Sequence, residues 1–152
     1  MNEKIMKDIK MPVLITFIIG IIAHSMIFFT EAMAPDALYF GNLCISGKWE
    51  ISLGRWGLIF LDTIRGGIVN KIFIILSSLI FLGLAVAIVC KIYKIKSKWG
   101  VLVISMLFAT MPQVSETFMY IYCADSYCLA LLASILAVYF IINGFEKNII
   151  SF

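Results

Sequence analysis

Four apolar stretches constrain the fold of this chain more than any other feature, because each is close to the length that crosses a bilayer. A run of about 20 apolar residues forms one transmembrane helix. The stretches cover residues 11–30, 69–90, 99–115 and 126–145. The sequence therefore predicts an all-α, polytopic membrane bundle of about four transmembrane helices, within a single membrane domain over residues 1–152.

The amino-acid composition also indicates a membrane protein. Hydrophobic residues make up 62% of the chain and charged residues 14%, whereas soluble domains have about 45–50% and about 25%. The net charge is only +3, so nucleic acid is not expected as a partner. The first apolar stretch is longer than the core of a signal peptide and no clear cleavage site follows it. We interpret it as a membrane span.

The distribution of basic residues predicts the orientation. Eight lysines would lie on one side of the bundle and four basic residues on the other. The first group is Lys4, Lys7, Lys10, Lys91, Lys94, Lys96, Lys98 and Lys147, and the second is Lys48, Arg55, Arg65 and Lys71. Loops on the cytoplasmic side of a membrane carry the excess of Lys and Arg. Both termini are therefore expected in the cytoplasm.

Acidic residues show the opposite distribution. Six of the nine acids fall in two segments that this topology places outside, residues 31–68 and residues 112–127; they are Glu31, Asp36, Glu50, Asp62, Glu116 and Asp125. Acids at a membrane edge are costly unless they are paired, hydrated or functional. This asymmetry is the first indication of a site.

The first external segment contains a predicted surface helix. In "SLGRWGLIFLDTIRGG", Ser52, Arg55, Asp62 and Arg65 would share one helix face, with apolar residues on the remainder. This pattern is typical of an extracytoplasmic interfacial helix, and Gly66-Gly67 would end it. The alternative is that its charged residues simply solvate a polar face.

The second external segment contains Glu116, Tyr120 and Asp125. Glu116 and Tyr120 are four residues apart and would share a helix face. Asp125 stands at the start of the last apolar stretch, where it could cap that helix. The tyrosines of this segment could instead form an aromatic belt at the membrane surface.

His24 and the four cysteines have more than one interpretation. A histidine inside a span can relay protons, or it can form a hydrogen bond to a neighbouring helix. The cysteines lack the paired spacing of a zinc site, and the sequence does not show a metal site. They could be small apolar residues near lipid, or Cys44 and Cys123 could form a disulfide outside the membrane.

The order of these features resembles the start of the GtrII-type glucosyl transferase family, which is similar to the wider GT-C class of membrane glycosyltransferases. The matching pieces are an external acid after the first span, Asp36, then "GRW" at 54–56, then the pattern of Pro112, Glu116, Tyr120 and Asp125 before the fourth span. The resemblance extends over roughly residues 12–145 and rests on the order and spacing of several weak motifs.

The resemblance implies a function and a location. Such enzymes transfer a sugar, typically glucose, from a polyprenyl-phosphate carrier to a surface polysaccharide such as O-antigen, at the outer face of the bacterial cytoplasmic (inner) membrane. It implies Asp36 as the general base, with Glu31 as the second candidate, and Arg55 as the contact to the donor phosphate. Glu116, Asp125 and Tyr120 would complete the acidic site and bind sugar hydroxyls. No cofactor is implied beyond the lipid-linked donor.

Two further expectations concern the extent and class of the protein. Family members are several times longer, so we expect this chain to correspond to the N-terminal part of a transferase, acting with a C-terminal portion or a partner subunit. The main alternative is a small non-catalytic four-span protein, such as an immunity or assembly factor. A transporter is disfavoured, because the first, third and fourth stretches carry no acidic or basic residue near their centres apart from His24.

Overall fold

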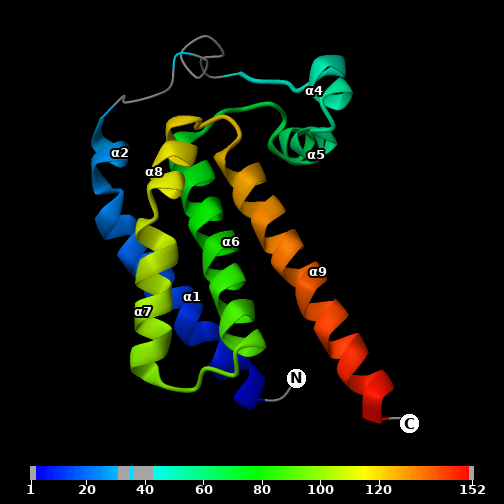
Figure 1. Ribbon diagram of the computed structural model, residues 1–152. Coiled ribbons are helices and arrows are strands. Elements are labelled where there is room, and N and C mark those ends of the chain that lie inside the picture. The colour runs from blue at the N-terminus through cyan, green and yellow to red at the C-terminus, as the bar shows by residue number, and fades with distance from the viewer. Residues whose placement is uncertain (1–2, 31–34, 36–42, 151–152) are drawn as a thin grey trace.

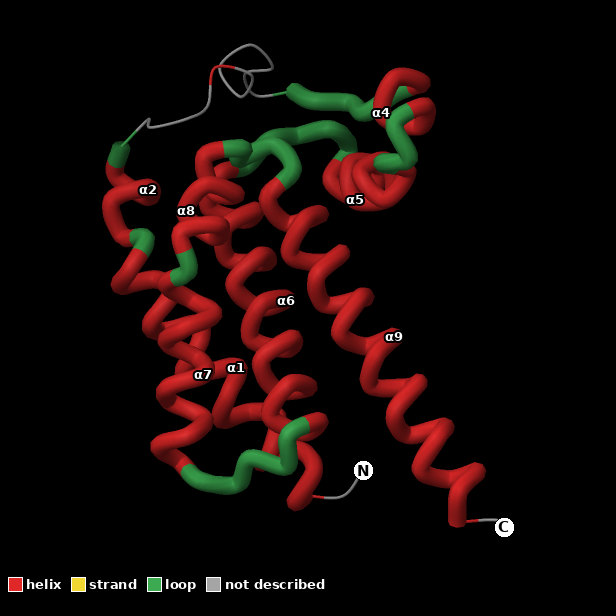
Figure 2. Tube along the Cα trace, viewed as in Figure 1, coloured by secondary structure: helices red, strands yellow, loops and turns green. Residues whose placement is uncertain are grey.

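The computed structural model describes residues 3–30, 35 and 43–150, and within these ranges it is helical (Figures 1 and 2). The one strand-like contact in the described part is an isolated bridge between Leu43 and Ile68. The helices are α1 Glu3–Ala23, α2 Ser25–Phe29, α4 Lys48–Ser52, α5 Trp56–Arg65, α6 Lys71–Ile92, α7 Lys98–Thr110, α8 Pro112–Met119 and α9 Ala124–Ile150. All four predicted apolar stretches are therefore present as helical segments.

Helix α6 is the centre of the bundle and packs against α1, α7 and α9 (Figure 1). It is apolar on every side, as expected of a helix surrounded by other helices and lipid. Its buried side chains, among them Ile74, Leu79 and Leu82, form the core with Phe118 of α8. The helix begins at Asn70, whose side-chain oxygen accepts the backbone N–H of Phe73 at 3.1 Å, which is a standard N-cap.

Two helices are long and apolar enough to cross a membrane, Lys71–Ile92 and Ala124–Gly144. The pair α7 and α8, bent by 42° at Met111, would make a third if it crosses as one span. Among the described residues, helix α1 is not one of these two. By length and composition the described residues thus provide two or three spans, where the sequence predicted about four.

The first predicted span is divided at His24. Helix α1 ends at Ala23 and α2 starts at Ser25, with His24 at the break. The His24 ring is buried, its Nε2 lies 2.8 Å from the carbonyl oxygen of Ala109, and it meets the Phe118 ring edge-on. Carbonyl groups in the last turn of a helix lack intrahelical partners, and Ala109 lies in that turn of α7. Of the two interpretations of His24, the structure supports the hydrogen bond to a neighbouring helix.

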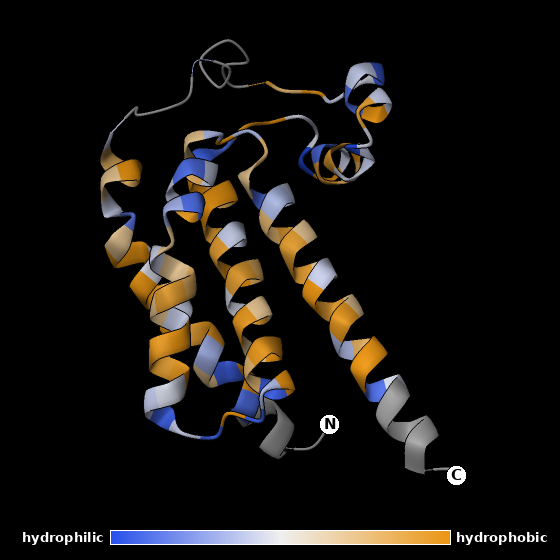
Figure 3. Cartoon of the chain, viewed as in Figure 1, coloured by the Kyte–Doolittle hydropathy of each residue, from blue (hydrophilic) through white to orange (hydrophobic). Residues whose placement is uncertain are grey.

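The described parts of the two predicted external segments lie at the same end of the bundle (Figure 1). Helices α4, α5 and α8 and the start of α9 gather there, while both described chain ends and the α6–α7 loop lie at the other end. Figure 3 shows the apolar residues concentrated along the lengths of the long helices, with hydrophilic residues toward both ends. The described helices of the two segments that the sequence placed on one side of the membrane are therefore together in space.

The predicted surface helix is in fact two helices, because Gly54 adopts a left-handed φ of 76° and separates α4 from α5. Its polar residues also do not share one face. Ser52 and Arg55 are exposed, whereas Asp62 is buried against the bundle. The exposed side of α5 is apolar and carries Trp56, Phe60 and Ile64. The predicted end of the helix is confirmed, since Gly66 and Gly67 both have left-handed φ angles.

Candidate functional site

An open cleft of about 560 Å³ lies at the end of the bundle that carries α5 and α8. It brings together three predicted site residues that are up to 65 positions apart, Arg55, Glu116 and Tyr120. The remaining lining residues are Gln113, Thr117, Tyr122 and Tyr127. One cation, one carboxylate and several hydroxyl and amide groups thus surround a single open space.

Helix α8 presents its polar face to this cleft. Pro112 occupies the first turn, where a missing backbone N–H costs nothing. From there Gln113, Glu116 and Tyr120 follow at spacings of three and four, which places them on one side of the helix. The opposite side carries Val114 and Phe118, which are buried in the core. Core packing on one face therefore fixes the direction of the polar groups on the other.

Arg55 contributes the positive charge of the cleft. It occupies the N-cap position of α5, and no side chain caps that helix end. Its guanidinium forms none of the ion pairs found among the described residues. Unsatisfied N–H groups at a helix start and an arginine side chain both favour anions. This corner of the cleft is suited to a phosphate or a carboxylate.

A second hollow, of about 470 Å³, adjoins the cleft and runs between α5 and α9. Its walls are mainly apolar and include Leu58, Phe60 and Leu129. Arg55 and Tyr127 line both hollows, and Tyr127 is 41% exposed. A polar cleft and an apolar groove therefore meet at an arginine, an arrangement that suits an amphiphilic molecule with an anionic head.

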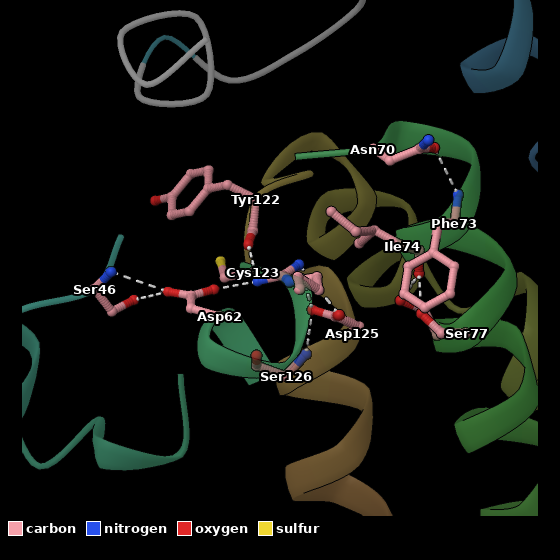
Figure 4. Close-up of polar contacts among 12 residues, drawn as sticks. Ser46, Asp62, Asn70, Phe73, Ile74, Ser77, Tyr122, Cys123, Asp125 and Ser126 are labelled. Carbon is pink, nitrogen blue, oxygen red and sulfur yellow. Dashed lines mark hydrogen bonds and ion pairs between the residues drawn. The ribbon is translucent and has the colours of Figure 1, made fainter. Parts of the chain in front are cut away.

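Asp125 belongs to a buried ion-pair network beside the cleft. Arg65 of α5 lies 3.2 Å from the Asp125 carboxylate and also pairs with Asp62. The same guanidinium donates to the carbonyl oxygen of Tyr122 at 3.0 Å. Asp62 in turn accepts hydrogen bonds from the backbone N–H and the hydroxyl of Ser46 (Figure 4). The network ties the surface helix to the start of α9.

This pairing bears on the role predicted for Asp125. The residue is 2% exposed and is not among the residues that line the cleft. It lies inside the first turn of α9, where its carboxylate accepts the backbone N–H of Ser126 at 2.8 Å (Figure 4). Its observed contacts are those of a structural anchor, and its predicted catalytic role stays a prediction.

The other two predicted acids, Asp36 and Glu31, lie outside the described residues. Their roles as general base and second candidate also stay predictions. Glu116, by contrast, is exposed in the cleft. Among the described residues, Glu116 supplies the carboxylate that lines the cleft.

Several lining residues were missed by the sequence analysis as parts of a site. Gln113 and Thr117 share the helical register of Glu116 and Tyr120, so the same spacing would have found them. Tyr122 and Tyr127 had been assigned as candidates for an aromatic belt. The contact between Arg65 and Asp125 joins residues 60 positions apart, and no local pattern in the sequence indicates it.

All four cysteines are buried free thiols in the structure. Burial is the main cause that raises the pKa of the Cys123 thiol to about 12, and the nearby Asp125 carboxylate adds to the effect. Burial and the Asp62 carboxylate likewise raise the pKa of Cys44. Thiols with raised pKa values are poor nucleophiles and poor metal ligands near neutral pH. Within the described ranges, no group of three His, Cys, Asp or Glu residues is arranged to hold a metal ion.

Fold and site together define a helical membrane protein with a polar, arginine-containing cleft at one end of its bundle. Comparison with known families then gives its membership: residues 41–152 match the family described as glucosyl transferase GtrII, and the chain belongs to this family. The matched region contains Arg55, Glu116 and Tyr120 but begins after Glu31 and Asp36. Neither a curated protein nor a solved structure gave a match.

Proposed function

We propose that this chain forms part of a membrane glucosyltransferase that takes glucose from a polyprenyl-phosphate carrier and transfers it to a surface polysaccharide such as O-antigen. The observation that carries the proposal is the meeting of the polar cleft and the apolar groove at Arg55. A lipid-linked sugar phosphate has the same three parts, an apolar chain, an anionic linkage and a hydroxyl-rich sugar. Family membership supports the same class of reaction.

The residues have distinct roles in this proposal. The lipid chain lies in the groove between α5 and α9, and the Arg55 guanidinium binds the donor phosphate through its planar donors. Glu116 and Tyr120 face the sugar in the cleft, where a carboxylate and a phenol can bind its hydroxyls. In this proposal each group binds a different part of the donor.

The reaction requires a base and an anion-binding group. An acceptor hydroxyl attacks the anomeric carbon, the bond from that carbon to the phosphate oxygen breaks, and the lipid phosphate leaves with the bonding electrons. The proton of the hydroxyl passes to a carboxylate, which is Asp36 or Glu31 in the prediction from the sequence. Arg55 stabilises the charge that develops on the leaving phosphate. No nucleotide takes part in this step.

Substitutions in the cleft test the proposal. We expect Arg55→Gln and Glu116→Gln to lower polysaccharide glucosylation at least tenfold. Groups that stabilise charge or transfer protons in a transition state typically raise the reaction rate by about 10²–10⁴-fold. The measurement is the glucose content of the polysaccharide in cells whose own gene is replaced by the variant. Asp36→Asn in the same assay tests the predicted base.

Matched controls come from the same helix as Glu116 and from the helix next to Arg55. Lys48→Gln removes an exposed cation from the neighbouring helix α4, and Ser115→Ala changes an exposed residue of α8 that does not line the cleft. Both should leave glucosylation intact. Full glucosylation in the Arg55 and Glu116 variants, at normal protein levels, would favour a non-catalytic assembly or immunity role.

A further inference from the structure

A third hollow, of about 420 Å³, lies at the opposite end of the bundle from the cleft. It is bounded by α1, the end of α6, the α6–α7 loop and α7. Its lining combines Lys91, Lys94, Lys96 and Asp8 with apolar residues such as Pro12 and Val101. None of these residues belongs to the candidate site described above.

The charged lining is strongly positive on balance. All three lysines and Asp8 are exposed, so three basic residues and one acidic residue surround the hollow. The Lys91 ammonium also lies 5.6 Å from the centre of the Tyr139 ring of α9, which holds it close to the bundle. A compact anion at the opening would contact several ammonium groups together.

The inner wall of the hollow is apolar and well packed. Cys90 and Val101 are buried there in a small cluster with Val86, and Ile95 packs against that cluster. Such a wall excludes a hydrated ion but accepts the glycerol and upper acyl region of a lipid. The hollow thus has basic residues around it and an apolar wall within. These two features match the anionic headgroup and the apolar acyl chains of a phospholipid.

The backbone holds one of the lysines in an unusual conformation. Lys94 has a φ of 55°, the left-handed region that favours glycine. It ends α6 in a Schellman motif. The N–H of Ile95 donates to the carbonyl oxygen of Cys90 at 2.8 Å, and the N–H of Lys94 donates to the carbonyl oxygen of Lys91 at 3.1 Å. This turn brings Lys94 to the hollow between Lys91 and Lys96.

From these observations we propose that this hollow is a binding site for an anionic phospholipid. The phosphodiester lies among Lys91, Lys94 and Lys96, and the start of the acyl chains lies against the apolar wall. Basic pockets between helices at a membrane surface are known sites for anionic headgroups. The site is separate from the transferase cleft and does not depend on the proposed function.

Lipid retention by the purified chain tests the site. The protein is exchanged into detergent and titrated with phosphatidylglycerol or with phosphatidylcholine of the same acyl chains, and bound lipid is counted by native mass spectrometry. We expect phosphatidylglycerol to bind more tightly. The double variant Lys91→Gln/Lys96→Gln should lose roughly 30-fold in affinity, because each lysine near a membrane surface contributes about a fivefold factor.

Charge-matched controls separate the hollow from a diffuse positive surface. Lys10→Gln/Lys98→Gln removes two exposed lysines at the same end of the bundle that do not line the hollow, and it should retain the affinity. An equal loss in both double variants would overturn the site. So would equal binding of the two lipids. Competition by glycerol 3-phosphate at the same concentration as the lipid would show a free-phosphate site instead.

Discussion

Arg65 has three partners at the junction between α5 and α9: Asp62, Asp125 and the carbonyl of Tyr122. The side chains of Arg65 and of both acids are no more than 5% exposed. Removing one partner of a buried ion pair leaves an uncompensated charge, which costs about 3–5 kcal/mol. The network therefore stabilises the position of α5, and with it Arg55 at the other end of that helix.

We accordingly expect Arg65→Gln to destabilise the protein by about 3–5 kcal/mol, measured as a lower thermal midpoint in detergent. Asp125→Asn should have a smaller effect in the same direction, because an amide can still accept from Ser126 and Arg65. Arg55→Gln is the control, since its guanidinium is exposed. If Asp125→Asn abolished glucosylation at unchanged stability, the residue would have the predicted catalytic role rather than a structural one.

The thiol of Cys123 gives a second prediction at this scale. Its pKa of about 12 means that the reactive thiolate is roughly a thousandfold rarer at pH 8 than for a thiol with a pKa near 9. We expect N-ethylmaleimide to leave Cys123 unmodified at pH 8 in the folded protein and to modify it rapidly after denaturation. The check is peptide mass spectrometry, and fast labelling before denaturation would contradict the buried position.

At the scale of helices, α1 and α6 approach closely at Gly83. A Cβ atom at this position would lie 3.0 Å from the Cα of Val13, which is backbone and cannot rotate away. We expect Gly83→Val to cost about 1–3 kcal/mol, the usual range for overpacking. Gly144→Val is the matched control, because it makes the same change in a helix with nothing within 4 Å. Equal thermal midpoints for the two variants would show that α1 and α6 do not pack as described.

The helices themselves were largely predictable, but their breaks were less so. Runs of apolar residues fixed α6 and α9, since length and hydrophobicity decide whether a helix can span lipid. The break at His24 depends on a partner in α7 that is 85 positions away, and the division of α4 from α5 depends on one glycine. Local patterns do not report such distant contacts.

At the scale of the whole molecule, the sequence predicted which segments meet but not how each polar residue is used. Charge counting placed the two acidic segments on one side, and the structure places α4, α5 and α8 at one end of the bundle. This proximity put Arg55, Glu116 and Tyr120 in one cleft. It did not reveal that Asp62 and Asp125 are bound to Arg65 instead, because helix patterns give the face of a residue and not its partner.

The orientation of the bundle in the membrane is the remaining whole-molecule prediction. The end with the α6–α7 loop carries the larger share of the lysines, so we expect it in the cytoplasm and the cleft on the opposite side. Alkaline phosphatase fused after Lys48 should be active, because that enzyme folds outside the cytoplasm, and a fusion after Lys96 should be inactive. A cytoplasmic reporter at the same two positions should give the reverse pattern. An active phosphatase at Lys96 would place the cleft in the cytoplasm, where nucleotide sugars and not the outward-facing lipid-linked donor are the available substrates.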